Sequence, residues 1–151
     1  MECSIIVTYR CIMRCKMCNI WQHPTKANQE ISAQDLEKLP SVNVTNITGG
    51  EPLVRGDLAD IIEVMLKRSK RVCVSTSGWF PERVFKLSEK YPQVGFRVSI
   101  EGLSEKNDEL RGREGGFDRG LRTVLGLRSM GRKDVGFGIT VSNNNSDDML
   151  W

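Results

Sequence analysis

The segment Cys11–Cys18 holds three of the five cysteines in the chain, at Cys11, Cys15 and Cys18, with the spacing C-x3-C-x2-C. Three thiolates are one ligand short of a closed tetrahedral metal site or a fully ligated 4Fe–4S cluster. A metal centre with three protein ligands keeps one coordination position open, which is typical of catalytic rather than structural sites. The spacing therefore raises the question of what fills the open position.

Three kinds of chemistry fit these thiols. Free cysteines are disfavoured, because Arg10, Arg14 and Lys16 make this a polar loop in which exposed thiolates would be reactive. A zinc site completed by His23 would make the chain a non-catalytic zinc-binding α/β module. An iron–sulfur cluster with one iron left open for a small molecule is the third interpretation.

A glycine-rich motif, Gly49-Gly50-Glu51-Pro52, follows directly after the alternating segment Val42–Thr48. Two consecutive glycines let the backbone come close to a ligand, and exposed carbonyl groups suit an ammonium group. The alternative is an ordinary turn between a strand and a helix, since glycine and proline are common there. Because the motif follows a three-cysteine loop, we favour a ligand site.

Short β-branched or alternating runs predict the strands that position these motifs. The predicted strands are Ser4–Tyr9, Val42–Thr48, Arg71–Thr76, Gly95–Ile100 and Val135–Val141. Helical periodicity and capping residues predict the helices between them. These are a short helix opened by Ser32 and Asp35, a helix that Asp57 caps and that ends near Arg68, and helices over Glu82–Tyr91 and Phe117–Met130, the last with Leu121, Val124 and Leu125 facing the core.

Loops are predicted where glycine, proline and polar residues cluster. The segments Asn19–Glu30 and Gly102–Gly116 fit this description, and Ser146-Asp147-Asp148 resembles the start of a further helix. The repeating strand–helix order predicts an α/β fold with parallel strands and right-handed crossovers. An open doubly wound sheet and a β/α barrel both satisfy this order, and in both the motifs that follow strands would share one rim.

Composition excludes several classes of protein. The net charge of +3, with no run of five or six like charges, argues against a nucleic-acid surface. No apolar stretch approaches the roughly 20 residues that cross a bilayer, and no signal peptide is recognisable. Five cysteines, three of them closely spaced, do not suit a disulfide framework, so we expect a reducing, cytoplasmic setting.

Taken together, the three-cysteine loop and Gly49-Gly50-Glu51-Pro52 resemble the signature motifs of the radical S-adenosylmethionine (radical SAM) enzymes. The resemblance covers essentially the whole chain. It implies a partial (β/α)6 TIM-like barrel, of which about five βα units are present, with residues 1–151 forming a C-terminally incomplete radical SAM core domain. The motif style, including Ser99-Ile100-Glu101-Gly102 and Arg111-Gly112, resembles the branch with molybdenum-cofactor cyclases, sulfatase-maturing enzymes and peptide-modifying enzymes.

The resemblance also implies two cofactors and a reaction. A 4Fe–4S cluster held by Cys11, Cys15 and Cys18 would reductively cleave S-adenosyl-L-methionine to a 5′-deoxyadenosyl radical, which abstracts hydrogen from a substrate. The partners implied are an unidentified small-molecule or peptide substrate and an external one-electron reductant such as ferredoxin or flavodoxin. A nucleic-acid substrate is disfavoured by the weak net charge.

The resemblance also implies which residues bind the cosubstrate, each by its match to a family motif. Those expected to contact S-adenosylmethionine are Gly49, Gly50, Glu51, Pro52, Thr76, Ser99, Arg111 and Val141. Arg111 would pair with the methionine carboxylate, which a guanidinium fork suits well. Two departures stand out: Ser77 replaces the asparagine often found after Thr76, and Met17 replaces the aromatic residue common before the last cysteine, a place that Trp21 would fill instead.

Overall fold

The computed structural model describes residues 1–147 and contains one parallel sheet flanked by helices. The strands are β1 (Glu2–Ile6), β2 (Val42–Thr48), β3 (Ser69–Thr76), β4 (Gly95–Ser99) and β5 (Val135–Gly138). The α-helices are α1 (Ala33–Leu36), α2 (Leu58–Arg68), α3 (Pro81–Lys90), α4 (Ser104–Arg111) and α5 (Gly116–Ser129). Short 3-10 helices occur at η1 (Ile20–Gln22), η2 (Ala27–Gln29) and η3 (Pro52–Val54).

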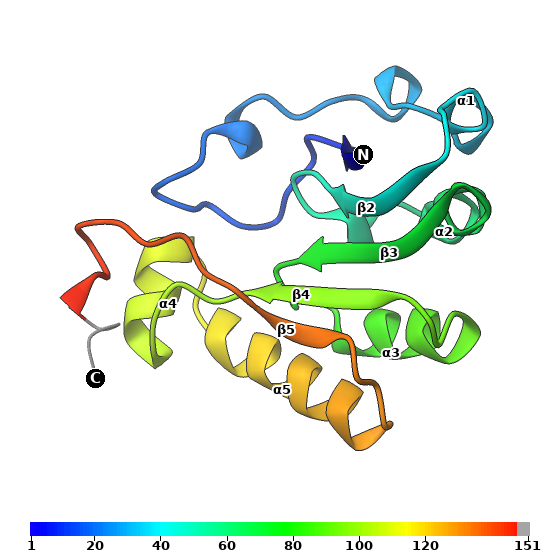
Figure 1. Ribbon diagram of the computed structural model, residues 1–151. Coiled ribbons are helices and arrows are strands. Elements are labelled where there is room, and N and C mark those ends of the chain that lie inside the picture. Colours follow the sequence, from blue (N-terminus) through cyan, green and yellow to red (C-terminus); the bar gives the residue numbers. More distant parts are fainter. Residues whose placement is uncertain (148–151) are drawn as a thin grey trace.

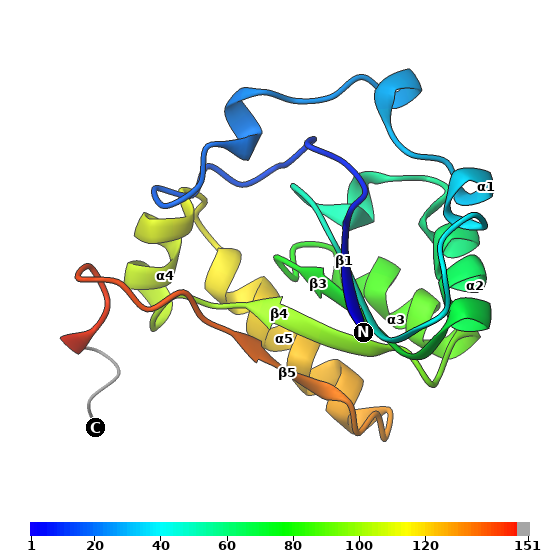
Figure 2. The ribbon, with the colours of Figure 1, turned by 45° about the horizontal axis from the view of Figure 1, so that its top comes forward.

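The strands lie in the order β1-β2-β3-β4-β5, and every neighbouring pair is parallel. A doubly wound sheet needs a point where the strand order reverses, and this sheet has none. Because each crossover runs to the next strand in the same direction, right-handed connections bring α2, α3 and α5 to one face of the sheet (Figure 1). The strand directions turn progressively from β1 to β5, which is the arrangement of a barrel segment (Figure 2).

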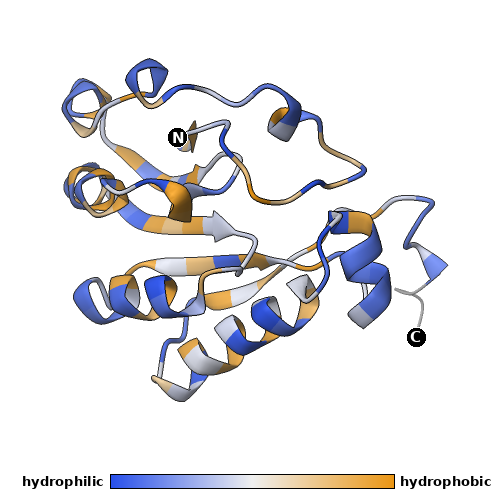
Figure 3. Ribbon diagram, turned by 180° about the vertical axis from the view of Figure 1, so that it is seen from behind, coloured by the Kyte–Doolittle hydropathy of each residue, from blue (hydrophilic) through white to orange (hydrophobic). Residues whose placement is uncertain are grey.

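The core lies between the sheet and these helices. It is built from fully buried aliphatic and aromatic side chains on both layers, among them Ile47, Val72, Val74, Phe96, Ile61, Ile62, Met65, Val84 and Leu127. Apolar and hydrophilic residues are interspersed along the strands, as in the alternating sequence of β2, and along the helices (Figure 3). Cys73 is buried in β3, and Cys3 packs against this core.

The structure corrects several of the predicted elements. The largest error is the loop predicted over Gly102–Gly116, because residues Ser104–Arg111 form α4. Few of its residues are apolar, so the hydrophobic pattern was weak. The helix is nevertheless anchored by Asn107, Leu110 and Arg111, which are buried at helical spacing, and Gly112 ends it in the left-handed conformation.

Smaller corrections concern element ends and faces. The first strand ends at Ile6 rather than Tyr9, and the fifth ends at Gly138 rather than Val141. Leu125 is 58% exposed, and Leu127 takes the predicted core position on α5. Asp57 precedes α2, but Arg55 binds its carboxylate, so no side-chain cap forms.

Two further predictions concern helix starts. The capping box of α1 is confirmed, because Ser32 accepts from the Asp35 amide at 3.1 Å and the Asp35 carboxylate accepts from the Ser32 amide. The helix predicted from Ser146 extends into residues 148–151, which lie outside the described part of the chain.

Within residues 1–147 there is no helix with the length and hydropathy needed to span a membrane.

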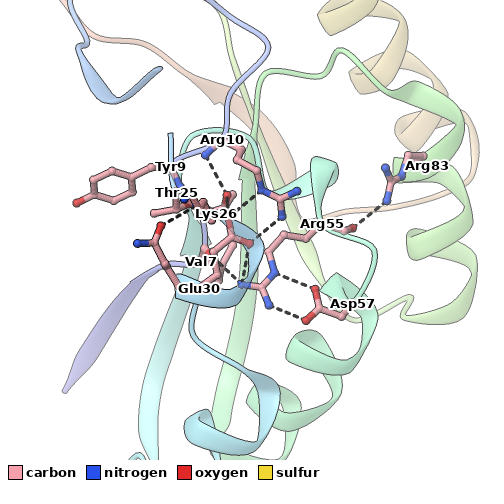
Figure 4. A network of polar contacts seen from close by, with 11 residues as sticks. Val7, Tyr9, Arg10, Thr25, Lys26, Glu30, Arg55, Asp57 and Arg83 are labelled. Atoms are coloured by element: carbon pink, nitrogen blue, oxygen red, sulfur yellow. Dashed lines mark hydrogen bonds and ion pairs between the residues drawn. The ribbon is translucent and has the colours of Figure 1, made fainter. Parts of the chain in front are cut away.

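The long connection between β1 and β2 carries the cysteines and has little regular structure. A buried ion network closes it at its base (Figure 4). The Glu30 side chain, 2% exposed, accepts from both Nε and a terminal nitrogen of Arg10, at 2.8 and 2.7 Å, and from the hydroxyls of Thr8 and Thr25. Arg55 lies 3.7 Å from the same carboxylate and donates to the Val7 carbonyl at 2.6 Å.

Burial alone would raise the pKa of Glu30, but the hydrogen bonds from Arg10, Thr8 and Thr25 outweigh it and lower the pKa from 4.5 to about 2. A carboxyl group whose pKa is depressed by folding stabilises the native state at pH values above its unfolded pKa. That contribution is lost as the pH falls through the folded value. The network therefore stabilises the base of the cysteine loop at neutral pH.

We expect Glu30→Gln to lower the free energy of unfolding at pH 7 by about 2 kcal/mol, because it removes charged hydrogen bonds from a buried site. The difference between wild type and variant should shrink as the pH falls from 4.5 towards 2. Urea unfolding at several pH values measures this. Glu82→Gln, which removes an exposed pair with Arg122, is the control and should change stability by less than about 0.5 kcal/mol. Equal effects of the two variants would contradict the prediction.

Candidate active site

A cavity of about 190 Å³ opens at the carboxyl ends of the strands, beneath the cysteine loop. The loop and α4 both lie at this end of the sheet (Figure 1). Eight predicted site residues line the cavity, namely Cys11, Cys15, Cys18, Gly49, Gly50, Thr76, Ser99 and Arg111. The sequence motifs that follow four different strands therefore converge on one space.

The three cysteines have free thiols, with Cys11 and Cys15 partly buried and Cys18 exposed. Burial raises the pKa of the Cys11 thiol, although the Met13 amide, which donates to its Sγ at 3.4 Å, opposes this. Burial likewise raises the pKa of Cys15. Both groups are therefore neutral thiols at pH 7 when no metal is bound, and metal binding would displace their protons.

The positions of the three cysteines and His23 test the alternative that these residues bind zinc. No group of three or more histidine, cysteine, aspartate or glutamate side chains within residues 1–147 converges on the position of a single ion. Zinc needs all its ligands at about 2.0–2.3 Å from one centre, whereas each thiolate of a cubane binds a separate iron. His23 is exposed and does not line the cavity. The arrangement gives the zinc module no support.

Gly49 and Gly50 bring the cysteine loop against the end of β2. The Gly50 amide donates to the Thr8 carbonyl at 2.7 Å, and the Glu51 amide donates to the Arg10 carbonyl at 2.9 Å. A Cβ at Gly50 would lie 2.4 Å from the Arg10 oxygen, and one at Gly49 would lie 2.5 Å from the Thr8 oxygen. Within residues 1–147 the carbonyls of Gly49 and Gly50 accept no hydrogen bond, so they remain available to a ligand.

The carboxyl end of α4 holds the other side of the same loop. The amides of Arg14 and Lys16 donate to the carbonyls of Arg111 and Leu110, at 3.1 and 2.8 Å. The last carbonyls of a helix have no partner within the helix, so the loop satisfies them. Gly112 makes this contact possible, since it has φ +64° and an added Cβ would lie 2.3 Å from the Arg14 oxygen.

Glu51 does not line the cavity, although we predicted it as a cofactor-binding residue. Its carboxylate is fully buried and accepts from the Leu53 amide at 3.1 Å and the Thr76 hydroxyl at 2.7 Å. The amide and hydroxyl of Ser77 donate to its second oxygen. Glu51 therefore ties the glycine turn to the end of β3, and the neighbouring Pro52 is buried at the start of η3.

Arg111 carries the most informative polar group in the cavity wall. One terminal nitrogen donates to Glu101 at 3.0 Å, whereas the buried Nε has no hydrogen-bond partner within residues 1–147. Buried N–H groups are rarely left without an acceptor. A guanidinium group in a cavity wall suits a carboxylate ligand. The thiol donor set and this unpaired group together fit an iron–sulfur cluster with an amino-acid chelate.

Sequence reasoning missed Glu101 as a site residue. It lines the cavity, is 3% exposed, pairs with Arg111 and accepts from the Thr140 amide at 2.7 Å. The one indication in the sequence was that Glu101 directly follows the fourth predicted strand, where site residues of a parallel sheet gather. Val141, predicted to border the cofactor, is 65% exposed and outside the cavity wall, where Thr140 lies instead. Trp21 lines the cavity together with Met17.

The fold and the site define an α/β protein with three thiols lining a cavity at the carboxyl rim of a barrel-like parallel sheet. The family model of the Radical SAM superfamily matches residues 5–151. The chain therefore belongs to the Radical SAM superfamily. The predicted cofactors, a 4Fe–4S cluster and S-adenosylmethionine, are confirmed at the level of this superfamily.

Curated relatives agree with this assignment. The Fe-coproporphyrin III synthase of Methanosarcina barkeri is 30% identical over 95% of this chain and 37% of that protein. The mycofactocin maturase MftC of Mycolicibacterium smegmatis is 30% identical over 95% of this chain and 38% of that protein. The GTP 3′,8-cyclase of Aquifex aeolicus is 26% identical over 97% of this chain and 49% of that protein. The chain thus spans between about a third and a half of the length of these relatives.

Solved structures agree in fold. The crystal structure of Streptococcus suis SuiB bound to S-adenosylmethionine superposes with a TM-score of 0.77 at 20% identity, over 99% of this chain and 36% of that chain. A structure of anSMEcpe with bound AdoMet and a peptide gives a TM-score of 0.63 at 16% identity, over 91% of this chain and 41% of that chain. The partial TIM-like barrel is therefore confirmed.

We expect Gly50→Ala to disrupt the cysteine loop, because the new Cβ would lie 2.4 Å from the Arg10 carbonyl oxygen. The variant should lose at least about 2 kcal/mol of unfolding free energy, and it should bind less iron on anaerobic reconstitution. Gly56→Ala is the matched control, since nothing lies within 4 Å of its added Cβ. Denaturant unfolding and iron analysis compare the two, and similar behaviour would argue against a close contact at Gly50.

Proposed function

We propose that this chain is the catalytic core of a radical SAM enzyme, with Cys11, Cys15 and Cys18 as the ligands of a 4Fe–4S cluster. The observation that carries the proposal is the shared cavity. Cys11, Cys15, Cys18 and Arg111 line the same space at the carboxyl ends of the strands. A cluster held by these three cysteines would keep one iron without a protein ligand, and S-adenosylmethionine would bind there.

Different residues of the cavity would bind different groups of the cosubstrate. Arg111, oriented by Glu101, would donate to the methionine carboxylate. The free carbonyls of Gly49 and Gly50 would accept from the ammonium group. Thr76 and Ser99 line the far wall from β3 and β4. When bound, the reduced cluster supplies the electron that cleaves the sulfonium S–C5′ bond and releases the 5′-deoxyadenosyl radical.

The apolar side of the cavity would keep water from that reaction. Met17, Ile20 and Trp21 line it from the cysteine loop and η1. A thioether and an indole can both pack against a purine ring. We therefore propose that Met17 and Trp21 together occupy the place of the aromatic residue that the family commonly has before its last cysteine.

For the substrate and the reductant we propose chemical classes rather than particular molecules. The relatives include enzymes named for peptide maturation, such as the sporulation killing factor maturation protein SkfB of Bacillus subtilis, and enzymes named for small molecules. We propose a small-molecule or peptide substrate and an external one-electron reductant such as ferredoxin or flavodoxin. Residues 1–151 would be the core domain, and the free state of all five cysteines supports a reducing, cytoplasmic setting.

We expect Cys15→Ala to abolish reductive cleavage of S-adenosylmethionine to 5′-deoxyadenosine and methionine, because one cluster corner would lose its ligand. The reconstituted wild type should be brown and contain about four irons per chain. His23→Ala separates the two metal chemistries, since it should leave iron content and cleavage unchanged. Zinc binding that depends on His23, or undiminished turnover by the cysteine variant, would refute the assignment.

We expect Arg111→Lys to weaken binding of S-adenosylmethionine by roughly ten- to a hundredfold, because lysine keeps the charge but loses the guanidinium fork. Equilibrium dialysis with reconstituted protein measures the dissociation constant. Iron content and thermal unfolding should stay near the wild-type values, since lysine can still pair with Glu101. An unaltered affinity would leave Arg111 with a structural role only.

A further inference from the structure

Side chains donate hydrogen bonds to several carbonyl groups of the cysteine loop, and the first donors belong to the loop itself. A terminal nitrogen of Arg14 donates to the carbonyls of Cys11 and Met13, at 3.0 and 2.8 Å. The Arg14 guanidinium also lies over the Trp21 ring, 5.0 Å from its centroid. Trp21 in turn donates through Nε1 to the Cys15 carbonyl at 3.3 Å. One arginine and one tryptophan thus fix three carbonyls of the segment that carries the thiols.

A second arginine reaches the same loop from beyond α4. Arg113 donates to the Ile12 carbonyl at 2.7 Å. Its guanidinium lies over the Trp79 ring, 4.0 Å from the centroid, and Arg119 lies on that ring as well, at 4.4 Å. Stacking on an indole restricts the guanidinium, so the donor is already oriented towards the carbonyl.

The charges of these two arginines are not neutralised by acids. Neither Arg14 nor Arg113 forms an ion pair with a carboxylate in the described part of the chain. Neighbouring Lys16 differs, since it pairs with Glu109 at 2.6 Å. Two positive charges without an acidic partner in the described part of the chain thus lie on or against the loop that, under the proposed function, would carry an anionic cluster.

We infer that Arg14 and Arg113 are positioning residues that hold the cysteine loop in its ligand-binding conformation before any metal binds. This inference rests on the proposed function for its purpose, but its physical content concerns the metal-free protein. Groups that orient metal ligands from outside the coordination sphere also tune the centre. In the loaded protein the same two charges favour the more negative, reduced state of the cluster, so they raise its reduction potential.

The test in the metal-free protein is the rate at which each cysteine reacts with a maleimide, measured by peptide mass spectrometry. Loss of charged hydrogen bonds should let the loop open more often, so Arg14→Ala should label Cys11 and Cys15 faster by several-fold, up to roughly tenfold. Arg113→Ala should act in the same direction, and the double variant should exceed either. Arg14→Lys, which keeps the charge and one donor group, should recover part of the protection.

Two internal references make the result decisive. Arg122→Ala removes an exposed arginine that pairs with Glu82 and does not contact the loop, so its labelling rates should equal the wild type. Cys73, buried in β3, should stay slow in every variant. Unchanged rates at Cys11 and Cys15 in the double variant would overturn the inference. So would faster labelling of Cys73 to the same degree, because the arginines would then stabilise the whole fold.

The loaded protein gives a second readout. In a redox titration followed by electron paramagnetic resonance, Arg14→Ala and Arg113→Ala should lower the midpoint potential, and Arg14→Lys should stay near the wild type. An unchanged potential in both alanine variants would refute the electrostatic part. A wild-type protein that binds no iron would instead refute the proposed function, whereas the labelling experiment would still decide whether the arginines position the loop.

Discussion

The buried carboxylate of Glu30 is the contact on which the rim of this protein depends. It joins the start of the cysteine loop, at Thr8 and Arg10, to its end at Thr25. Closing a long loop costs conformational entropy, and this loop has only short 3-10 turns to offset it. A buried charge stabilises such a closure only when its oxygens are fully hydrogen-bonded, which is the case here. Arg55 extends the network to the segment before α2, so the base of the loop is fixed to the sheet.

Above this base, the loop is held through its main chain as well as by the side chains of Arg14, Trp21 and Arg113. Its carbonyls accept from the amides that follow β2, and its amides donate to the carbonyls that end α4. Main-chain contacts of this kind do not depend on the side chains between the cysteines. They do require glycine wherever the two backbones meet, at Gly49, Gly50 and Gly112. The diglycine is therefore needed for close chain packing, whereas the sequence alone presents an ordinary turn and a ligand site as alternatives.

Much of this arrangement could be predicted because each motif follows a strand of clear pattern. Parallel strands with consecutive order bring their carboxyl ends to one rim, so the thiols, the glycines and Ser99 had to meet there. Contacts between distant polar residues left no local signal. Glu30 lies in a polar loop and nothing nearby indicates Arg10 as its partner. Glu51 has the residue type of a ligand, but Thr76 and Ser77, on another strand, draw its carboxylate into the protein.

The same reasoning explains why α4 was not predicted although it supplies Arg111 to the cavity wall and binds the cysteine loop. Its buried residues include Asn107 and Arg111, which hydrophobic periodicity does not count. Both are buried because they bind Glu101. The side-chain oxygen of Asn107 accepts from the Glu101 amide at 2.9 Å, and Arg111 donates to the Glu101 carboxylate.

A buried ion pair of this kind stabilises a fold little, since desolvation offsets most of the attraction. Its effect is to hold the Arg111 guanidinium in one orientation in the cavity wall, so that it need not reorient when a carboxylate ligand binds. The buried polar residues of α4 therefore explain both why hydrophobic periodicity did not predict this helix and how it places Arg111 in the cavity wall.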